Sequence, residues 1–258
     1  LIADVIPEKE RGEAYGILRA LDSAGAMLGP LVGLLVFPFL NFRPLFFFAS
    51  TFTILSVLIV LAFVREVRAK RKAARRLLVP IKGRFLLLLV SYSLFVVVFM
   101  NYAFFVSAAY EAGVALLALP VLMIVFNASY SAFCYPTGLL LDRVKKRHVL
   151  ASGLIAYALL CFYCSYAIGF LAFLPAFILF GYVMATTDVS ARALVAEIST
   201  PEERASYFGT FYMITGLLRL VGLGLVGFFW DLLGRTAVFT IASLLSITAC
   251  IVVEASRL

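Results

Sequence analysis

Long, uninterrupted apolar stretches constrain this chain more than any other feature of its sequence. Eight stretches reach the roughly 20 residues that a helix needs to cross the ~30 Å hydrocarbon core of a bilayer. They are continuously apolar, whereas the strands of a transmembrane barrel alternate over about ten residues. We therefore expect an all-α integral membrane protein. The predicted spans are Glu13–Phe39, Pro44–Val64, Phe85–Ala109, Gly113–Leu141, Val149–Gly169, Leu171–Ala196, Ala205–Trp230 and Thr236–Glu254.

The composition excludes a water-soluble or disordered chain. Of 258 residues, 64% are apolar and only 14% are charged, which leaves too few polar side chains to cover a surface in water. In a soluble domain the net charge of +8 would suggest nucleic acid. Here the densest basic segment, Arg65–Arg84, has no interleaved aromatic side chains for stacking on bases. We expect the lipid bilayer as a partner and no nucleic acid.

The positions of Lys and Arg predict the orientation in the membrane. Seventeen of them lie in one alternate set of connections and the C-terminal tail, and two lie in the other set. Basic connections stay on the cytoplasmic side. We therefore expect a multi-pass protein of the plasma membrane with a cytoplasmic C-terminus.

An internal repeat predicts the domain organisation. The segment Leu1–Gly16 reappears as Leu194–Gly209, at an offset of 193 residues. We interpret 1–64 as the last two spans of an N-terminal six-helix bundle, 65–84 as a basic cytoplasmic linker and 85–258 as a complete C-terminal six-helix bundle. If the two halves match in length, about 110 residues, or four spans, precede this sequence in the whole protein.

Two motifs, together with the related halves and the basic linker, resemble the major facilitator superfamily. The segment GLLLDRVKKRH from Gly138 to His148 is similar to the signature that follows the second span of each half, although Lys145 replaces a Gly. The resemblance implies a helical bundle with eight of an expected twelve spans in this chain. A fifth-span motif common in the antiporters of that family is matched by Gly16, Gly25, Gly29, Pro30 and Gly33, with Leu34 in place of a final Gly.

Charged side chains inside the predicted spans are candidate sites, because a charge in the bilayer is costly unless it is paired or wetted. These are Arg19, Asp22, Asp188, Arg192 and Arg219. The spacing of three or four residues lets Arg19 meet Asp22, and Asp188 meet Arg192, on one helical face. Desolvation favours the neutral form of a carboxyl group, and a nearby arginine favours its ionised form. With these opposing effects, we expect Asp22 or Asp188 to take up and release protons. The alternative is a static ion pair. Arg219 can bind an anionic substrate or a carbonyl of another helix.

The resemblance implies two further sets of residues. Candidate substrate contacts, in two spans that line the central cavity of the family, are Asn101, Tyr102, Asn127 and Tyr130; polar residues of this kind also join helices to one another. A cytoplasmic gate, a charged latch that is remade as the transporter switches faces, would comprise Gly138, Asp142, Arg143, Glu197 and Arg204. The alternative for the gate is a basic loop held in the cytoplasm by its charge.

Enzyme motifs are absent from the sequence, which has one His, no HExxH, no GxSxG and no P-loop. We therefore expect no enzyme, cofactor, metal or obligate protein partner. The expected function is secondary active transport by alternating access, with proton-coupled export of a small organic molecule as the leading hypothesis. Proton-coupled uptake, or a non-transporting sensor or scaffold with the same fold, are the alternatives.

Overall fold

In the computed structural model, residues 11–36, 39, 42–63, 79–200 and 202–255 are described. They fold into α-helices and one short 3-10 helix, and they contain no strand, which confirms the all-α prediction. The chain forms two compact units, 1–73 and 74–258, and each is described by itself.

The described residues of the first unit form two helices, α2 (Arg11–Val36) and α3 (Phe42–Phe63). The described side chains of α3 are mostly apolar and are exposed within this chain, with Leu45 as an exception in burial, and the mean hydropathy of its membrane-length segment is 2.5. A helix that is apolar on all sides is stable only in lipid or in a larger core. Helix α2 is less apolar and carries Pro30 in its interior.

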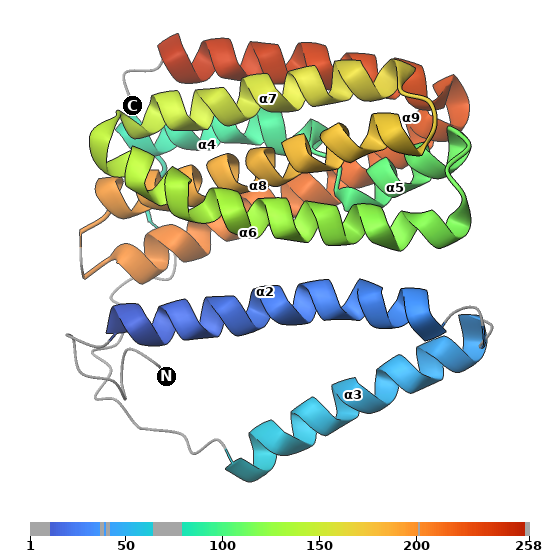
Figure 1. The fold of residues 1–258 in the computed structure, drawn as a ribbon. Helices are drawn as coiled ribbons and strands as arrows, with labels where there is room; N and C mark the ends of the chain where they lie inside the picture. Colours follow the sequence, from blue (N-terminus) through green and yellow to red (C-terminus); the bar gives the residue numbers. More distant parts are fainter. Residues whose placement is uncertain (1–10, 37–38, 40–41, 64–78, 201, 256–258) are drawn as a thin grey trace. The chain divides into compact units, whose positions relative to one another are not determined.

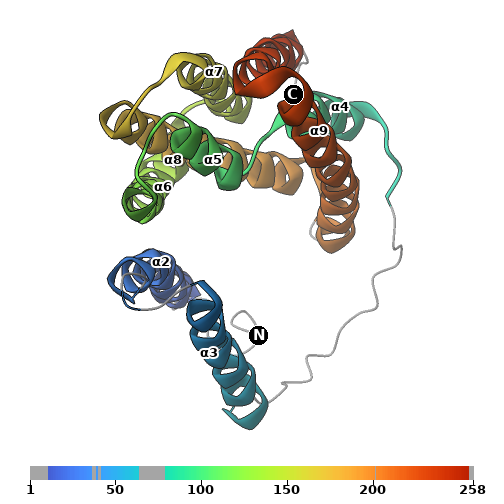
Figure 2. The same ribbon diagram turned by 90° about the vertical axis from the view of Figure 1, so that its right-hand side faces the viewer.

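The second unit is a helical bundle whose long helices lie roughly side by side (Figures 1 and 2). Helix α8 packs against α6 and α7, and α9 packs against α4 and α7. The elements in chain order are α4 (Gly83–Val98), α5 (Tyr102–Glu111), η1 (Leu116–Ala118), α6 (Leu119–Arg143), α7 (Lys146–Tyr166), α8 (Phe170–Ile198) and α9 (Arg204–Ala255).

Aromatic rings fill the core of this bundle. The Phe105 ring lies 4.6 Å from Phe180 and 5.3 Å from Phe239, measured between ring centroids. Phe126 stacks on Phe180 with ring centroids 4.9 Å apart. These rings come from α5, α6, α8 and α9, and offset or edge contacts at such distances are favourable beyond their buried area. They hold α8 and α9, which carry two walls of the candidate site, against α5 and α6.

The predicted span Phe85–Ala109 is not one continuous helix. Helix α4 ends at Val98 and α5 begins at Tyr102, and the Asn101 side chain caps α5 by accepting the Ala103 N–H at 3.0 Å. The buried Tyr157 hydroxyl makes two hydrogen bonds to the break, as it accepts the Met100 N–H and donates to the Val98 carbonyl. A break at membrane depth is stable where side chains satisfy the freed backbone groups.

Helix α9 consists of two arms joined at Gly234. This glycine has φ +77°, within the 52-residue helix, a conformation that a residue with a Cβ rarely adopts. The Arg235 guanidinium holds the turn by donating to the Ala108 carbonyl at 2.9 Å and the Ala167 carbonyl at 3.4 Å. We call 204–233 the first arm and 235–255 the second arm. The division agrees with the predicted boundary between the last two spans.

Among the described residues, six helical segments are long and apolar enough to cross a membrane. The two arms of α9 count as one of these six, and α2 contributes only the shorter apolar segment Gly25–Val36. The predicted count of eight membrane spans is therefore not confirmed. The predicted domain boundaries within 65–84 also stay predictions.

Candidate functional site

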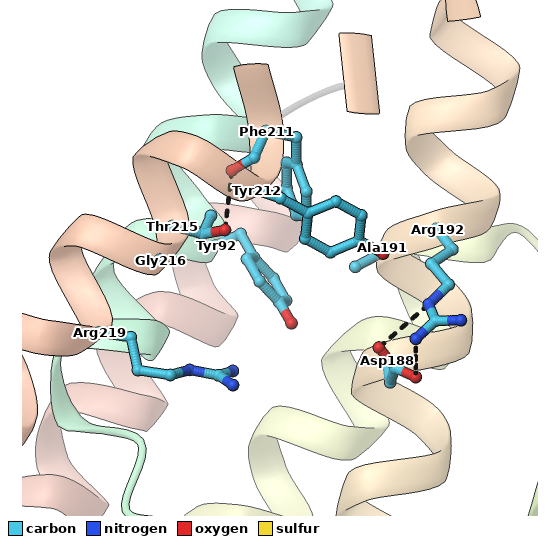
Figure 3. A pocket seen from close by; sticks show the side chains of 9 residues that line it. All are labelled: Tyr92, Asp188, Ala191, Arg192, Phe211, Tyr212, Thr215, Gly216 and Arg219. Atoms are coloured by element: carbon cyan, nitrogen blue, oxygen red, sulfur yellow. Dashed lines mark hydrogen bonds and ion pairs between the residues drawn. The ribbon is translucent and has the colours of Figure 1, made fainter. Parts of the chain in front are cut away.

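A pocket of about 130 Å³ opens between α4, α8 and the first arm of α9. Figure 3 shows it from close by. Its walls combine charged, phenolic and small side chains, a mixture that is uncommon in this apolar chain. The lining residues are Tyr92, Asp188, Ala191, Arg192, Phe211, Tyr212, Thr215, Gly216 and Arg219.

Asp188 and Arg192 form the charged pair on the α8 wall. Arg192 Nε lies 3.2 Å from Asp188 Oδ1, and Nη2 lies 2.9 Å from Oδ2. This two-point contact is the strongest geometry for a guanidinium and a carboxylate. The spacing of four residues on one helix places them there. The sequence predicted this pairing.

Tyr92 brings a phenol into the pocket from α4. Its ring is buried and lies 5.2 Å from the Phe211 ring, and its hydroxyl end points into the space between the two charged walls (Figure 3). Thr215 donates its hydroxyl proton to the Phe211 carbonyl at 2.7 Å, one turn earlier on the same arm. The hydroxyl oxygens of both side chains can still accept hydrogen bonds.

Arg219 supplies a positive charge on the α9 wall. Its Cζ lies 5.3 Å from the centroid of the Phe99 ring, within the range of a cation–π contact. In the part of the chain that the structure describes, no carboxylate pairs with this guanidinium. The close crossing of α9 over α4 places it there: a Cβ on Gly222 would overlap the Val97 carbonyl.

The pocket therefore holds two guanidinium groups and one carboxylate. Asp188 neutralises Arg192, and Arg219 remains as the excess positive charge. The arrangement can bind a charged group.

A second charged cluster lies at the end of the bundle where α4 and α7 begin and α8 and α9 finish. Glu197 Oε1 lies 3.1 Å from Arg84 Nη2, and Oε2 lies 2.6 Å from Lys146 Nζ. Glu254 Oε1 lies 2.7 Å from His148 Nδ1. These contacts join the ends of four helices, and we call the Glu197 group the end cluster.

The structure brings together three of the five predicted intramembrane charges, namely Asp188, Arg192 and Arg219. Asp22 lies on α2 with an exposed side chain, and the side chain of Arg19 is outside the described residues. The glycine pattern also lies on α2. Around Gly25, Gly29 and Gly33, a Cβ would meet nothing within 4 Å; Gly16 and Pro30 lie on the same helix.

The predicted cavity residues do not belong to the lining of this pocket. Asn101 caps α5, and Asn127 donates to the Met123 carbonyl at 2.8 Å within its own helix. Tyr130 stacks on Phe126 with ring centroids 6.2 Å apart. Tyr102 is half exposed. A role for these four in substrate binding stays a prediction.

The predicted gate residues are spread over the same end of the bundle. Glu197 belongs to the end cluster, where its described partners are Arg84 and Lys146. Gly138 and Arg143 lie in the last part of α6 and Arg204 begins α9; the side chain of Asp142 is outside the described residues. The gate stays a prediction.

Sequence reasoning missed the aromatic and hydroxyl side chains of the pocket. Tyr92, Tyr212 and Thr215 are polar residues inside apolar spans, and this feature of the sequence could have marked them as candidate pocket residues. Phe99 and Gly222 gave no such signal, because their importance depends on where α4 crosses α9.

Comparison with known proteins identifies the family. The family model described as Major Facilitator Superfamily matches residues 1–127 and again 85–257. The chain belongs to the Major Facilitator Superfamily. The predicted resemblance is thereby confirmed. This is a family of membrane transporters, and with several apolar helices the chain is a multi-pass membrane protein. Membership of a transporter family argues against an enzyme.

Three relatives show how far the similarity extends. An uncharacterized MFS-type transporter of Methanocaldococcus jannaschii is 28% identical over 243 residues, which cover 90% of this chain and 61% of the relative. Multidrug resistance protein MdtG of Rahnella sp. and of Enterobacter lignolyticus are each 41% identical over 66 residues, covering 26% of this chain and 16% of the relative. This chain thus spans less than two thirds of the length of each.

Proposed function

We propose that the chain carries the proton-coupling and substrate-binding pocket of a secondary transporter that exports a small organic molecule. The single observation that carries this proposal is the Asp188–Arg192 pair on the wall of the pocket. A carboxylate in a span is costly, and here it lies at a cavity that can admit a substrate. Alternating access between two six-helix bundles would expose the pocket to each side in turn.

The described residues can be grouped into eight helical segments for such a transporter. These are α2, α3, the broken span α4 and α5, η1 with α6, α7, α8 and the two arms of α9. We propose that they are eight of twelve spans. The end cluster would face the cytoplasm of the cell, since it adjoins the basic connections, and the C-terminus would lie on that side of the plasma membrane.

Protonation of Asp188 is the proposed coupling step. The ionised carboxylate holds Arg192 through two contacts, and a proton on the carboxylate weakens that hold. A cationic substrate group can bind only the ionised carboxylate, and protonation neutralises that carboxylate. The substrate and the proton therefore cannot bind Asp188 at the same time. Mutually exclusive binding is the condition for exchanging an outgoing substrate for an incoming proton. Asp22 is the corresponding candidate in the first unit.

The direction of export is supported by two sequence relationships. The glycine pattern on α2 is similar to the motif of antiporters, and two relatives are named multidrug resistance proteins. Proton-coupled uptake is the second candidate, favoured by the excess positive charge of Arg219. A purely anionic substrate would bind more tightly when Asp188 is protonated, and the two would then move together.

The test uses inside-out membrane vesicles that contain the protein made from its native gene. Respiration acidifies the vesicles, and the members of a panel of small organic compounds, phenylalanine and phenylalanine methyl ester among them, are added one at a time while a pH-sensitive dye reports proton release. We expect release from vesicles with the wild type and none with Asp188→Asn at equal protein level. Asp231→Asn is the matched control, because Asp231 is an exposed carboxylate of α9 outside the pocket.

Two outcomes would contradict the proposal. If vesicles with Asp188→Asn release as many protons as vesicles with the wild type, this carboxylate has no role in proton coupling. A sensor or scaffold predicts no proton release from any vesicle with any member of a panel of small organic compounds.

A further inference from the structure

The pocket presents opposite charges on two walls. Arg219 extends from the first arm of α9 toward the α8 wall, and Asp188 lies on that wall with Arg192 (Figure 3). Both charges reach the same space of about 130 Å³. A ligand in this space therefore meets a cation on one side and a carboxylate on the other.

Arg219 is available for an anionic group. Its Cζ lies over the Phe99 ring, 5.3 Å from the centroid, and a cation–π contact does not use up the N–H donors. In the described residues they have no carboxylate partner. Two parallel N–H donors match the two oxygens of a carboxylate. The aromatic support restricts the guanidinium and reduces the entropy lost on binding.

Asp188 can accept a cationic group without losing Arg192. Each carboxylate oxygen has two acceptor sites, and Arg192 uses one on each oxygen. The Arg192 side chain is 56% exposed and that of Asp188 is 29% exposed, so the pair is not sealed from the pocket. An ammonium group can therefore share the carboxylate with the arginine.

The surface between the two charges is largely aromatic. Tyr92, Phe211 and Tyr212 lie along it. The volume is below the ~300–1,000 Å³ of pockets that enclose drug-sized ligands. It is large enough for the charged part of a molecule together with a compact apolar group.

We propose that the substrate is an amphoteric small molecule whose carboxylate binds Arg219 and whose protonated amine binds Asp188. The apolar body would lie against Tyr92 and Tyr212. This inference rests on the proposed function, since it takes the pocket to be the substrate site. It also explains how a site with excess positive charge can support export, because the amine and the coupling proton compete for one carboxylate.

Three matched probes test the proposal in the purified protein made from its native gene. Phenylalanine carries both charges, N-acetylphenylalanine only the negative one and phenylalanine methyl ester only the positive one. Their dissociation constants are measured by calorimetry below neutral pH. We expect the wild type to bind phenylalanine most tightly. A lost charge-assisted hydrogen bond weakens binding by about tenfold or more.

Each variant should weaken a different pair of probes. Arg219→Gln should weaken phenylalanine and N-acetylphenylalanine by about tenfold or more, with the ester unchanged. Asp188→Asn should weaken phenylalanine and the ester, and it should tighten N-acetylphenylalanine, because the neutral amide no longer neutralises Arg192. The proposal is overturned if the wild type binds none of the probes, if it binds the ester most tightly, or if Arg219→Gln leaves all three constants unchanged.

The outcome is separable from that of the vesicle experiment. Loss of proton release in Asp188→Asn with no effect of Arg219→Gln on the probes would preserve proton coupling and remove the amphoteric substrate. Unchanged proton release in Asp188→Asn, with the expected effect of Arg219→Gln on the probes, would preserve the binding site and remove proton coupling.

Discussion

The Tyr157 hydroxyl, on α7, accepts the backbone N–H of Met100 at 2.9 Å, although Met100 belongs to the break between α4 and α5. The same hydroxyl donates to the Val98 carbonyl at 2.8 Å. Tyr157 and Met100 are both fully buried, so water cannot replace these bonds. The ring of Phe99, which also belongs to the break, lies 5.2 Å from the Tyr157 ring and makes the cation–π contact with Arg219. One phenol thus orders the backbone beneath the pocket.

Tyr157→Phe should therefore destabilise the bundle. The change keeps the ring and leaves a buried N–H and a buried carbonyl without partners, at a cost of about 1–3 kcal/mol. We expect a lower free energy of unfolding in mixed micelles and faster hydrogen exchange at the Met100 amide. Tyr163→Phe is the control, because that hydroxyl bonds the Ala172 carbonyl at an exposed position. Equal effects of the two changes would contradict the role of the break.

Gly222→Ala should loosen the crossing of α4 and α9. The added methyl group would overlap the backbone of Val97, which cannot rotate away as a side chain can, and overpacking costs about 1–3 kcal/mol. At Gly224, where a Cβ meets nothing within 4 Å, alanine should be neutral or stabilise the helix by up to ~1 kcal/mol. Unfolding of both variants in mixed micelles measures the difference, and similar stabilities would refute the close contact.

A cycle of Asp188→Asn, Arg192→Gln and the double variant separates proton coupling from a static ion pair. Both side chains are partly exposed, so the pair contributes only about 0–1 kcal/mol to stability. If the pair merely neutralises itself, the double variant should regain the proton release that each single variant loses. If Asp188 carries the proton, the double variant should remain uncoupled, which is the result we expect.

Glu197→Gln should weaken the end cluster in a way that depends on salt. The side chains of Glu197 and Arg84 are 39% and 50% exposed, so the expected loss is no more than ~1 kcal/mol at low ionic strength. It should shrink at high salt, because the solvent screens exposed charges. Glu202→Gln, at an exposed position next to the start of α9, is the control. A loss that does not change with salt would argue against an electrostatic origin.

Local sequence patterns predicted the features that depend on one segment at a time. The lengths of the apolar stretches predicted the helices, and the spacing of Asp188 and Arg192 predicted their contact. The interruption between Trp230 and Thr236 predicted the division of α9. In each case the cause lies in the covalent neighbourhood of the residues concerned.

Features that depend on distant segments escaped the sequence reasoning. The break after Val98 contains neither Gly nor Pro, and its hydrogen bonds come from Tyr157 on another helix. The sequence around Arg219 did not predict its contact with Phe99. Glu197 pairs with Arg84 and Lys146 because α4 and α7 begin where α8 finishes.

The turn at Gly234 sets how motion is distributed along the first arm of α9. Arg235 ties the turn to two backbone carbonyls, so the arm is anchored at this end, and Arg204 lies at the other. At 1.5 Å per residue, a rigid tilt of about 10° about the turn would move Arg204 by roughly 8 Å and Arg219 by roughly 4 Å. A modest rotation would thus open the far end of the bundle twice as far as it displaces the charge in the pocket.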